Sequence, residues 1–281
     1  MHSPYSALLS APPLRPVATK KIMNLTYQRS GRSGGSTGHL LPAAVLIGCS
    51  SFILLLTLKR ARSLPRGMSF QEAHIPEKNQ HLMFWLGVVV AASTGFMLCT
   101  ETYYQIIVPA YHPLTHHVLY LSYILVGFVA VLESKKRLPP DSHRRCLSLT
   151  LGVQFMIFLD HGMCKETPTD SKMHIMLAMI DLVGCTVVAF SVASPSSMEA
   201  YVASWVCLFL QGTWFVTLAL YSGFMDISVE RVCTYLGIQI LIVTTTVVVV
   251  VAGLCPNYFS RATLKQHDDD EKVELLWSWG S

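Results

Sequence analysis

The sequence predicts an all-α polytopic membrane protein, a helical bundle with seven transmembrane helices. Of its 281 residues, 52% are hydrophobic and 14% are charged, whereas about 25% charged residues is usual for soluble domains. The mean hydropathy is +0.44. A bilayer-spanning helix needs roughly 20 mostly apolar residues, and seven such windows alternate with charged or turn-forming stretches. They cover residues 39–58, 82–101, 116–133, 146–161, 174–193, 200–221 and 235–254.

The first, second and seventh windows are the clearest, and the fourth is the weakest. The fourth offers only the short apolar stretch Cys146–Leu159 between Arg145 and Asp160. Such a helix spans a bilayer with snorkelling side chains or local thinning of the membrane. Without it, the chain would have six helices and both termini on one side.

The windows divide the chain into three parts: a disordered tail over residues 1–37, the seven-helix domain over 38–255 and a cytoplasmic tail over 256–281. The first 37 residues are rich in Pro, Ser, Gly and basic residues, and they lack the compact apolar core of a signal peptide. The eight cysteines are scattered singly, which indicates neither a zinc knuckle nor a disulfide scaffold. A bridge between Cys164 and Cys233 stays open, because both fall in loops on the same side.

Basic residues in the loops predict the orientation, because loops rich in Lys and Arg are retained in the cytoplasm. The loops at 59–81, 134–145 and 194–199 carry ten Lys and Arg residues, and the opposite loops carry three. We therefore expect the N-terminus outside or in the lumen and the C-terminus in the cytoplasm. This orientation places the sequon at Asn24 outside, where it can be glycosylated.

Polar residues converge on the predicted outer ends of the helices. The candidate metal, proton or polar cluster consists of His39, Glu101, His116, His117, His161, Asp170, His174 and Asp181, with Asp160 at the same level. An ionisable residue inside a membrane helix is costly and suggests function. Such a cluster could coordinate a metal, relay protons or bind a lipid headgroup. Zinc, copper or haem are the cofactors such a cluster suggests, and none is firmly implied.

A simpler explanation of this cluster carries more weight. Polar residues prefer the membrane interface, and helix ends need polar partners for their free backbone groups. Asp181 does not fit that explanation, because it lies seven residues beyond His174 on one helical face, about 10 Å deeper. Gln154 and His161 have the same spacing on the fourth helix, and Gln211 or Thr186 are candidate partners for Asp181.

A second group of polar residues lies in the middle of the sixth helix, at Gln211, Gly212, Thr213 and Trp214. Small residues permit close helix approach, and Gln can hydrogen-bond across a helix interface. These four residues therefore predict helix packing rather than ligand binding. Pro42 likewise shapes the start of the first helix.

Read in order, the motifs resemble the transmembrane protein 45 family, which includes the transmembrane epididymal proteins and is largely of unknown function. The resemblance covers about residues 39–255 and rests on Gly38-His39-Leu40-Leu41-Pro42, Glu101, Thr115–Leu121, His161, Asp170, His174, Gly184-Cys185 and Leu210-Gln211-Gly212-Thr213-Trp214-Phe215. Two positions depart from the family pattern: Gln154 stands where the family tends to have Glu, and His161 alone remains of two histidines.

The C-terminal tail carries a candidate sorting signal, in which Glu271 precedes Leu275 and Leu276 at the spacing of an acidic dileucine motif. Its partners would be clathrin adaptors, and a solvated acidic tail is the alternative. The expected location is the plasma membrane or Golgi and endosomal membranes. The lipid bilayer is the other expected partner, and nothing predicts nucleic-acid binding.

Among functions, the sequence favours a non-enzymatic binding, scaffolding or trafficking-related membrane protein whose cleft opens outward. A metal- or proton-handling protein is the alternative. A membrane hydrolase of the zinc ceramidase type would need an H-x-x-x-H pair on a late helix, and the last window has no histidine. No internal repeat favours a transporter, and no D-R-Y or N-P-x-x-Y motif favours a G-protein-coupled receptor.

Overall fold

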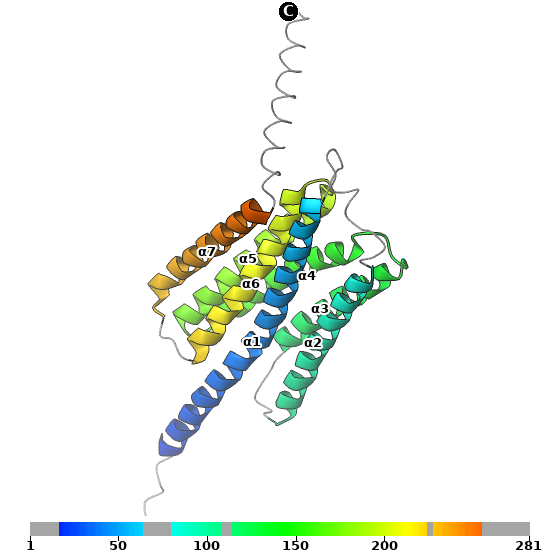
Figure 1. Cartoon of the computed structure of the whole chain (residues 1–281). Coiled ribbons are helices and arrows are strands. Elements are labelled where there is room, and N and C mark those ends of the chain that lie inside the picture. Colours follow the sequence, from blue (N-terminus) through cyan, green and yellow to red (C-terminus); the bar gives the residue numbers. More distant parts are fainter. Residues whose placement is uncertain (1–16, 64–79, 108–113, 224–226, 255–281) are drawn as a thin grey trace, which may run out of the picture.

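A computed structural model describes residues 17–63, 80–107, 114–223 and 227–254, with side chains from Gly38 onward. Within these ranges the chain forms helices and short turns without strands (Figure 1). The helices are α1 (Val17–Ser63), α2 (Gln80–Ile107), α3 (Leu114–Ser134), α4 (Ser142–Met163), α5 (Pro168–Ala193), α6 (Met198–Gly223) and α7 (Val232–Leu254), with the 3-10 turn η2 (Val229–Arg231) before α7.

Seven helices in the described part of the chain are long and apolar enough to cross a membrane. Each contains one predicted window, so the predicted all-α bundle of seven spanning helices is confirmed at that level. Helix α1 begins at Val17, within the predicted tail 1–37, but its apolar span begins only at Gly38. Helix α4 has the lowest mean hydropathy of the seven. It reaches 22 residues because it includes polar residues beyond the apolar window at both ends.

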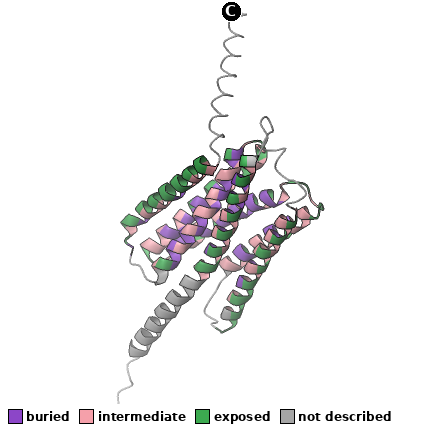
Figure 2. Ribbon diagram, viewed as in Figure 1, coloured by how far each residue is buried: buried purple, intermediate pink, exposed green. Residues whose placement is uncertain are grey.

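The helices pack mainly in three close pairs, α1 with α6, α4 with α5 and α2 with α3. Helix α5 also packs on α6, and α3 on α4, which joins the pairs into one bundle. Helix α7 lies at the edge and is exposed along most of its length (Figure 2). Its exposed valines, leucine and isoleucines suit contact with lipid rather than with protein.

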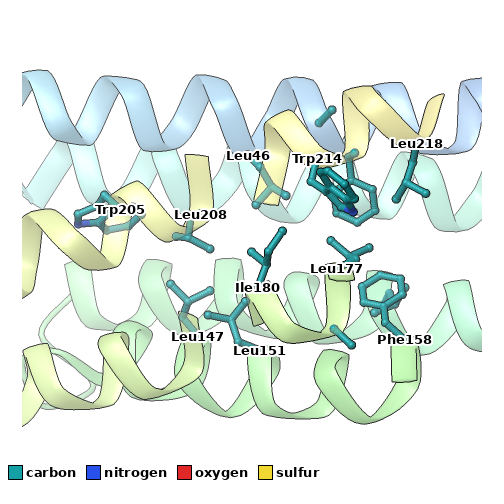
Figure 3. Close-up of a cluster of buried hydrophobic side chains, with 14 of the residues drawn as sticks. Leu46, Leu147, Leu151, Phe158, Leu177, Ile180, Trp205, Leu208, Trp214 and Leu218 are labelled. Atoms are coloured by element: carbon teal, nitrogen blue, oxygen red, sulfur yellow. The ribbon is translucent and has the colours of Figure 1, made fainter. Parts of the chain in front are cut away.

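The core lies where α4, α5, α6 and α1 meet. Leu147, Leu151 and Phe158 of α4 face Leu177 and Ile180 of α5 (Figure 3). Helix α6 covers them with its own large side chains, and α1 adds Leu46. The α6 side chains in this cluster are Trp205, Leu208, Trp214, Phe215 and Leu218. We call α4 to α6 the packed half of the bundle, because they supply most of this buried cluster.

The short turn between α3 and α4 is fixed by one carboxylate. Glu133 accepts hydrogen bonds from the backbone N–H groups of Asp141 and His143, both at 2.9 Å, and its Oε2 lies 2.8 Å from His143 Nδ1. Asp141 takes a left-handed conformation with φ of 64°. The carboxylate satisfies N–H groups that have no partner within the helix at an α-helix N-terminus.

Candidate functional site

A cleft lies between the α1–α6 pair and the α2–α3 pair, and residues of α4 also line it. Helices α1 and α2 make few contacts with each other, and residues of both line the cleft. The cleft has a volume of about 100 Å³. A single water molecule needs about 10–15 Å³ by the same measure. The cleft is therefore large enough for a ligand.

Apolar side chains form nearly all of the cleft wall. They come from α1 (Val45, Leu46, Ile53), α2 (Met83, Leu86, Val90, Met97), α3 (Leu119, Val126, Ala130), α4 (Leu147, Phe158) and α6 (Leu208, Phe215). Polar side chains line it at three depths: His39 and His116 at one end, Tyr123 and Gln154 in the middle, and His143 at the far end. His143 is already paired with Glu133.

Four helices bring their histidines together at the first end of the cleft, and we call His39, His116, His161 and His174 the histidine layer. The rings of His161 and His174 have centroids 4.9 Å apart. Those of His39 and His174 are 6.0 Å apart, and those of His116 and His161 are 6.4 Å apart. The structure thus joins four of the five histidines in the predicted cluster.

Carboxylates hold this layer from two sides. His116 Nδ1 lies 3.2 Å from Glu101 Oε1, which connects α3 to α2. His174 Nδ1 lies 2.8 Å from the backbone oxygen of Asp170 and 3.0 Å from its Oδ1. Asp170 Oδ2 also pairs with Lys165 at 3.2 Å. Since both neighbours of His174 Nδ1 are acceptors, that nitrogen carries the proton.

The remaining members of the predicted cluster lie elsewhere. His117 faces Thr102, with its Nε2 3.2 Å from the hydroxyl oxygen, and Asp160 is exposed. Asp181 is fully buried, deeper in the bundle than the histidine layer. Across the described residues, no three His, Cys, Asp or Glu side chains are placed to hold one metal ion. The described geometry therefore gives the metal hypothesis no support.

Asp181 belongs instead to a buried polar network in the middle of the bundle. Gln211 Nε2 donates to Gln154 Oε1 at 2.9 Å, and the hydroxyl of Tyr123 donates to the same oxygen at 3.3 Å. Gln211 and Tyr123 are both near Asp181, although neither carboxylate oxygen has a hydrogen bond in the described structure. Thr186, the other candidate partner, donates to the backbone oxygen of Leu182. Sequence reasoning missed Tyr123, whose seven-residue spacing from His116 was the available signal.

The α6 group predicted to pack helices lies against three neighbours. A Cβ on Gly212 would lie 2.8 Å from Ile47 Cγ1, so α1 and α6 approach closely there. Trp214 is fully buried, and its Nε1 donates to the backbone oxygen of Met173 at 3.0 Å. Gln211 contacts α4 through Gln154, whereas Thr213 donates to Leu210 within its own helix.

Several other predicted features lie beyond what the structure describes or differ from expectation. Cys164 and Cys233 are both free, so the bridge left open from the sequence is absent. Glu271, Leu275 and Leu276 lie outside the described residues. Asn24 lies where only the backbone is described.

Fold and site together define a polytopic helical membrane protein with an apolar cleft that is lined by histidines at one end. Comparison with family models adds that residues 141–226 match a family of unknown function (DUF716). The matched segment runs from Asp141 through α4, α5 and α6, the packed half of the bundle. No curated protein matches the chain.

Proposed function

We propose that this protein is a non-enzymatic membrane protein that binds an amphipathic, lipid-like ligand in the cleft between α1 and α2. The observation that carries the proposal is an apolar cleft within the spanning helices that has polar groups at one end. Bilayer lipid is itself apolar, so an alkyl chain gains no binding free energy from apolar contact alone when it moves from lipid into the cleft. Binding therefore requires that the shape of the chain fit the cleft and that its headgroup find polar partners.

The histidine layer supplies the polar end of this binding site. His39 and His116 line the cleft, and Glu101, Asp170 and Lys165 surround them with both signs of charge. Imidazole and carboxylate groups there can donate and accept hydrogen bonds. A headgroup with several oxygen atoms would find partners at this level, while its tail would extend toward Ala130 and Leu147.

A photoactivatable fatty acid carrying a diazirine and an alkyne tests the proposal on the full chain in nanodiscs. After illumination, we expect labelled peptides to contain cleft residues such as Met83 and Met97. Val90→Trp would fill the cleft and reduce labelling there, whereas Val89→Trp on the exposed side of α2 would not. Labelling confined to outward-facing residues, unchanged by Val90→Trp, would contradict the proposal.

We further propose membership of the transmembrane protein 45 family, with the N-terminus outside. The matched segment 141–226 includes Asp170, His174 and Gln211–Phe215, which carry much of the resemblance. The excess of basic residues in three loops supports the orientation. Sequons introduced singly into the 59–81 and 162–173 loops test it, because only the second should be glycosylated.

The C-terminal motif supports residence in the plasma membrane or Golgi and endosomal membranes, with clathrin adaptors reading Glu271, Leu275 and Leu276. Replacing both leucines with alanine should move a tagged protein toward the cell surface. Replacing Leu264, another leucine of the same tail, serves as the control. An unchanged distribution would remove the sorting signal from the proposal.

A further inference from the structure

Tyr123 and Gln154, the polar pair in the middle of the cleft, do not make all the hydrogen bonds that their side chains allow. Gln154 is 1% exposed, and its oxygen accepts from Gln211 and Tyr123. Its Nε2 has no hydrogen-bond partner among the described residues. A buried amide nitrogen without an acceptor destabilises the folded state, so the presence of this one in the cleft wall requires an explanation.

The other polar groups at this level do not supply the missing acceptor; Asp181 belongs to the same network, but neither of its carboxylate oxygens has a hydrogen bond in the described structure. Gln211 Oε1 accepts from the hydroxyl of Tyr123 at 3.4 Å. Thr94 lines the cleft too, but its hydroxyl donates to the backbone oxygen of Val90 on its own helix. The hydroxyl of Tyr123 donates to the side-chain oxygens of Gln154 and Gln211. The oxygen of that hydroxyl can therefore still accept a hydrogen bond. The pair therefore offers one donor and one acceptor.

We infer that Tyr123 and Gln154 form a specificity site for a hydroxyl group carried within the apolar part of the ligand. A hydroxyl accepts one hydrogen bond and donates another. It would accept a hydrogen bond from Gln154 Nε2 and donate one to the hydroxyl oxygen of Tyr123. This inference rests on the proposed function, because it assumes that an amphipathic ligand occupies the cleft.

Two helices give the same depth for this site. His116 and Tyr123 are seven residues apart on α3, and His161 and Gln154 are seven apart on α4. At 1.5 Å per residue, both spacings correspond to about 10 Å. Since His116 marks the polar end of the cleft, the ligand class is a long-chain amphiphile with a hydroxyl about 10 Å from its headgroup.

A competition experiment with matched fatty acids tests the inference. Stearate and 10-hydroxystearate compete with the photoactivatable fatty acid for labelling of cleft peptides in nanodiscs. We expect the hydroxy acid to compete at about fivefold lower concentration, the ratio given by one net hydrogen bond. Gln154→Met keeps the side-chain length and should equalise the two acids. Gln239→Met on α7, outside the cleft, should leave the preference intact.

Tyr123→Phe gives a second route should Gln154→Met fail to fold, because it removes only the hydroxyl. It too should abolish the preference, and Tyr103→Phe on the exposed face of α2 should not. Equal competition by both acids in the wild-type protein would overturn the inference and leave the proposed function standing, as expected if only water fills the site. A preference that survives both variants would also overturn it. Absence of any cleft labelling would reject the proposed function itself.

Discussion

Gly87 of α2 and Gly127 of α3 meet backbone to backbone. A Cβ built on either glycine would lie 2.6 Å from the carbonyl oxygen of the other, which is closer than real contacts allow. Ala91 and Ala130 flank the crossing and keep it narrow. Small residues at such a crossing let membrane helices approach closely. Since Gly87 and Gly127 also line the cleft, this crossing sets one of its walls.

The Gly87–Gly127 crossing predicts that Gly87→Ala destabilises the protein. The added methyl would force α2 from α3, a cost of about 1–3 kcal/mol for an overpacked site. Gly95→Ala on the same helix is the control, because a Cβ there meets nothing within 4 Å. Thermal unfolding in detergent should show a lower melting temperature for Gly87→Ala alone. Equal melting temperatures would mean that the two helices separate at no cost.

The hydrogen bond from Trp214 to Met173 joins α6 to α5 in the packed half of the bundle. Trp214→Phe should lower the melting temperature, because it removes the donor and leaves a cavity at a fully buried position. The expected cost is about 1–3 kcal/mol. Trp85→Phe is the matched control, since Trp85 is 61% exposed. A similar change in both variants would indicate that the hydrogen bond contributes nothing specific.

Arg144 links three helices close to the α3–α4 turn. Its Nη1 donates to Asp141 at 3.0 Å, its Nη2 donates to Ser191 of α5, and its guanidinium lies 4.6 Å from the ring centroid of Tyr201 on α6. Arg144→Met should cost about 2 kcal/mol, less than the usual 3–5 kcal/mol for a fully buried pair because Asp141 is partly exposed.

Variants of Arg144 separate charge from geometry. Lysine carries its three donors on a single nitrogen, so it lacks the planar fork that directs Nη1 to Asp141 and Nη2 to Ser191. Arg144→Lys should therefore recover only part of the lost stability. The exposed neighbour Arg145 gives the control, and Arg145→Met should unfold at the wild-type temperature. Full recovery by lysine would show that charge alone matters here.

The number and type of helices were predictable because hydropathy is a local property of the chain. The bounds of α4 were not, since the helix begins at Ser142 with His143 and Arg144 buried. Glu133 of α3 and Ser191 of α5 are hydrogen-bond partners of those two side chains. These partners belong to other helices, and hydropathy along α4 does not register them. The hydropathy window therefore begins after the helix itself begins at Ser142.

The sequence also predicted part of the candidate site, namely the level at which its histidines lie. Helix ends on one side of the membrane predicted that His39, His116, His161 and His174 would share one level. Which of His116 and His117 faces Glu101 depends on the rotation of α3 about its axis, which packing decides. The cleft depends on the distance between α1 and α2, and no sequence window reports that distance. Asp181 was noticed, but its network with Gln154 and Tyr123 required the relative heights of four helices.

Asp181 gives the last prediction. It is fully buried, and neither carboxylate oxygen has a hydrogen bond of normal geometry within the described structure, although Gln211 lies close enough to interact. Burying an ionised carboxylate without full compensation is costly. Asp181→Asn keeps the shape and removes the ionisable group, so it should raise the melting temperature. Asp160→Asn at an exposed position should not. A lower melting temperature for Asp181→Asn would instead show that the carboxylate stabilises the folded state, which would make the network around Gln211 a charged site.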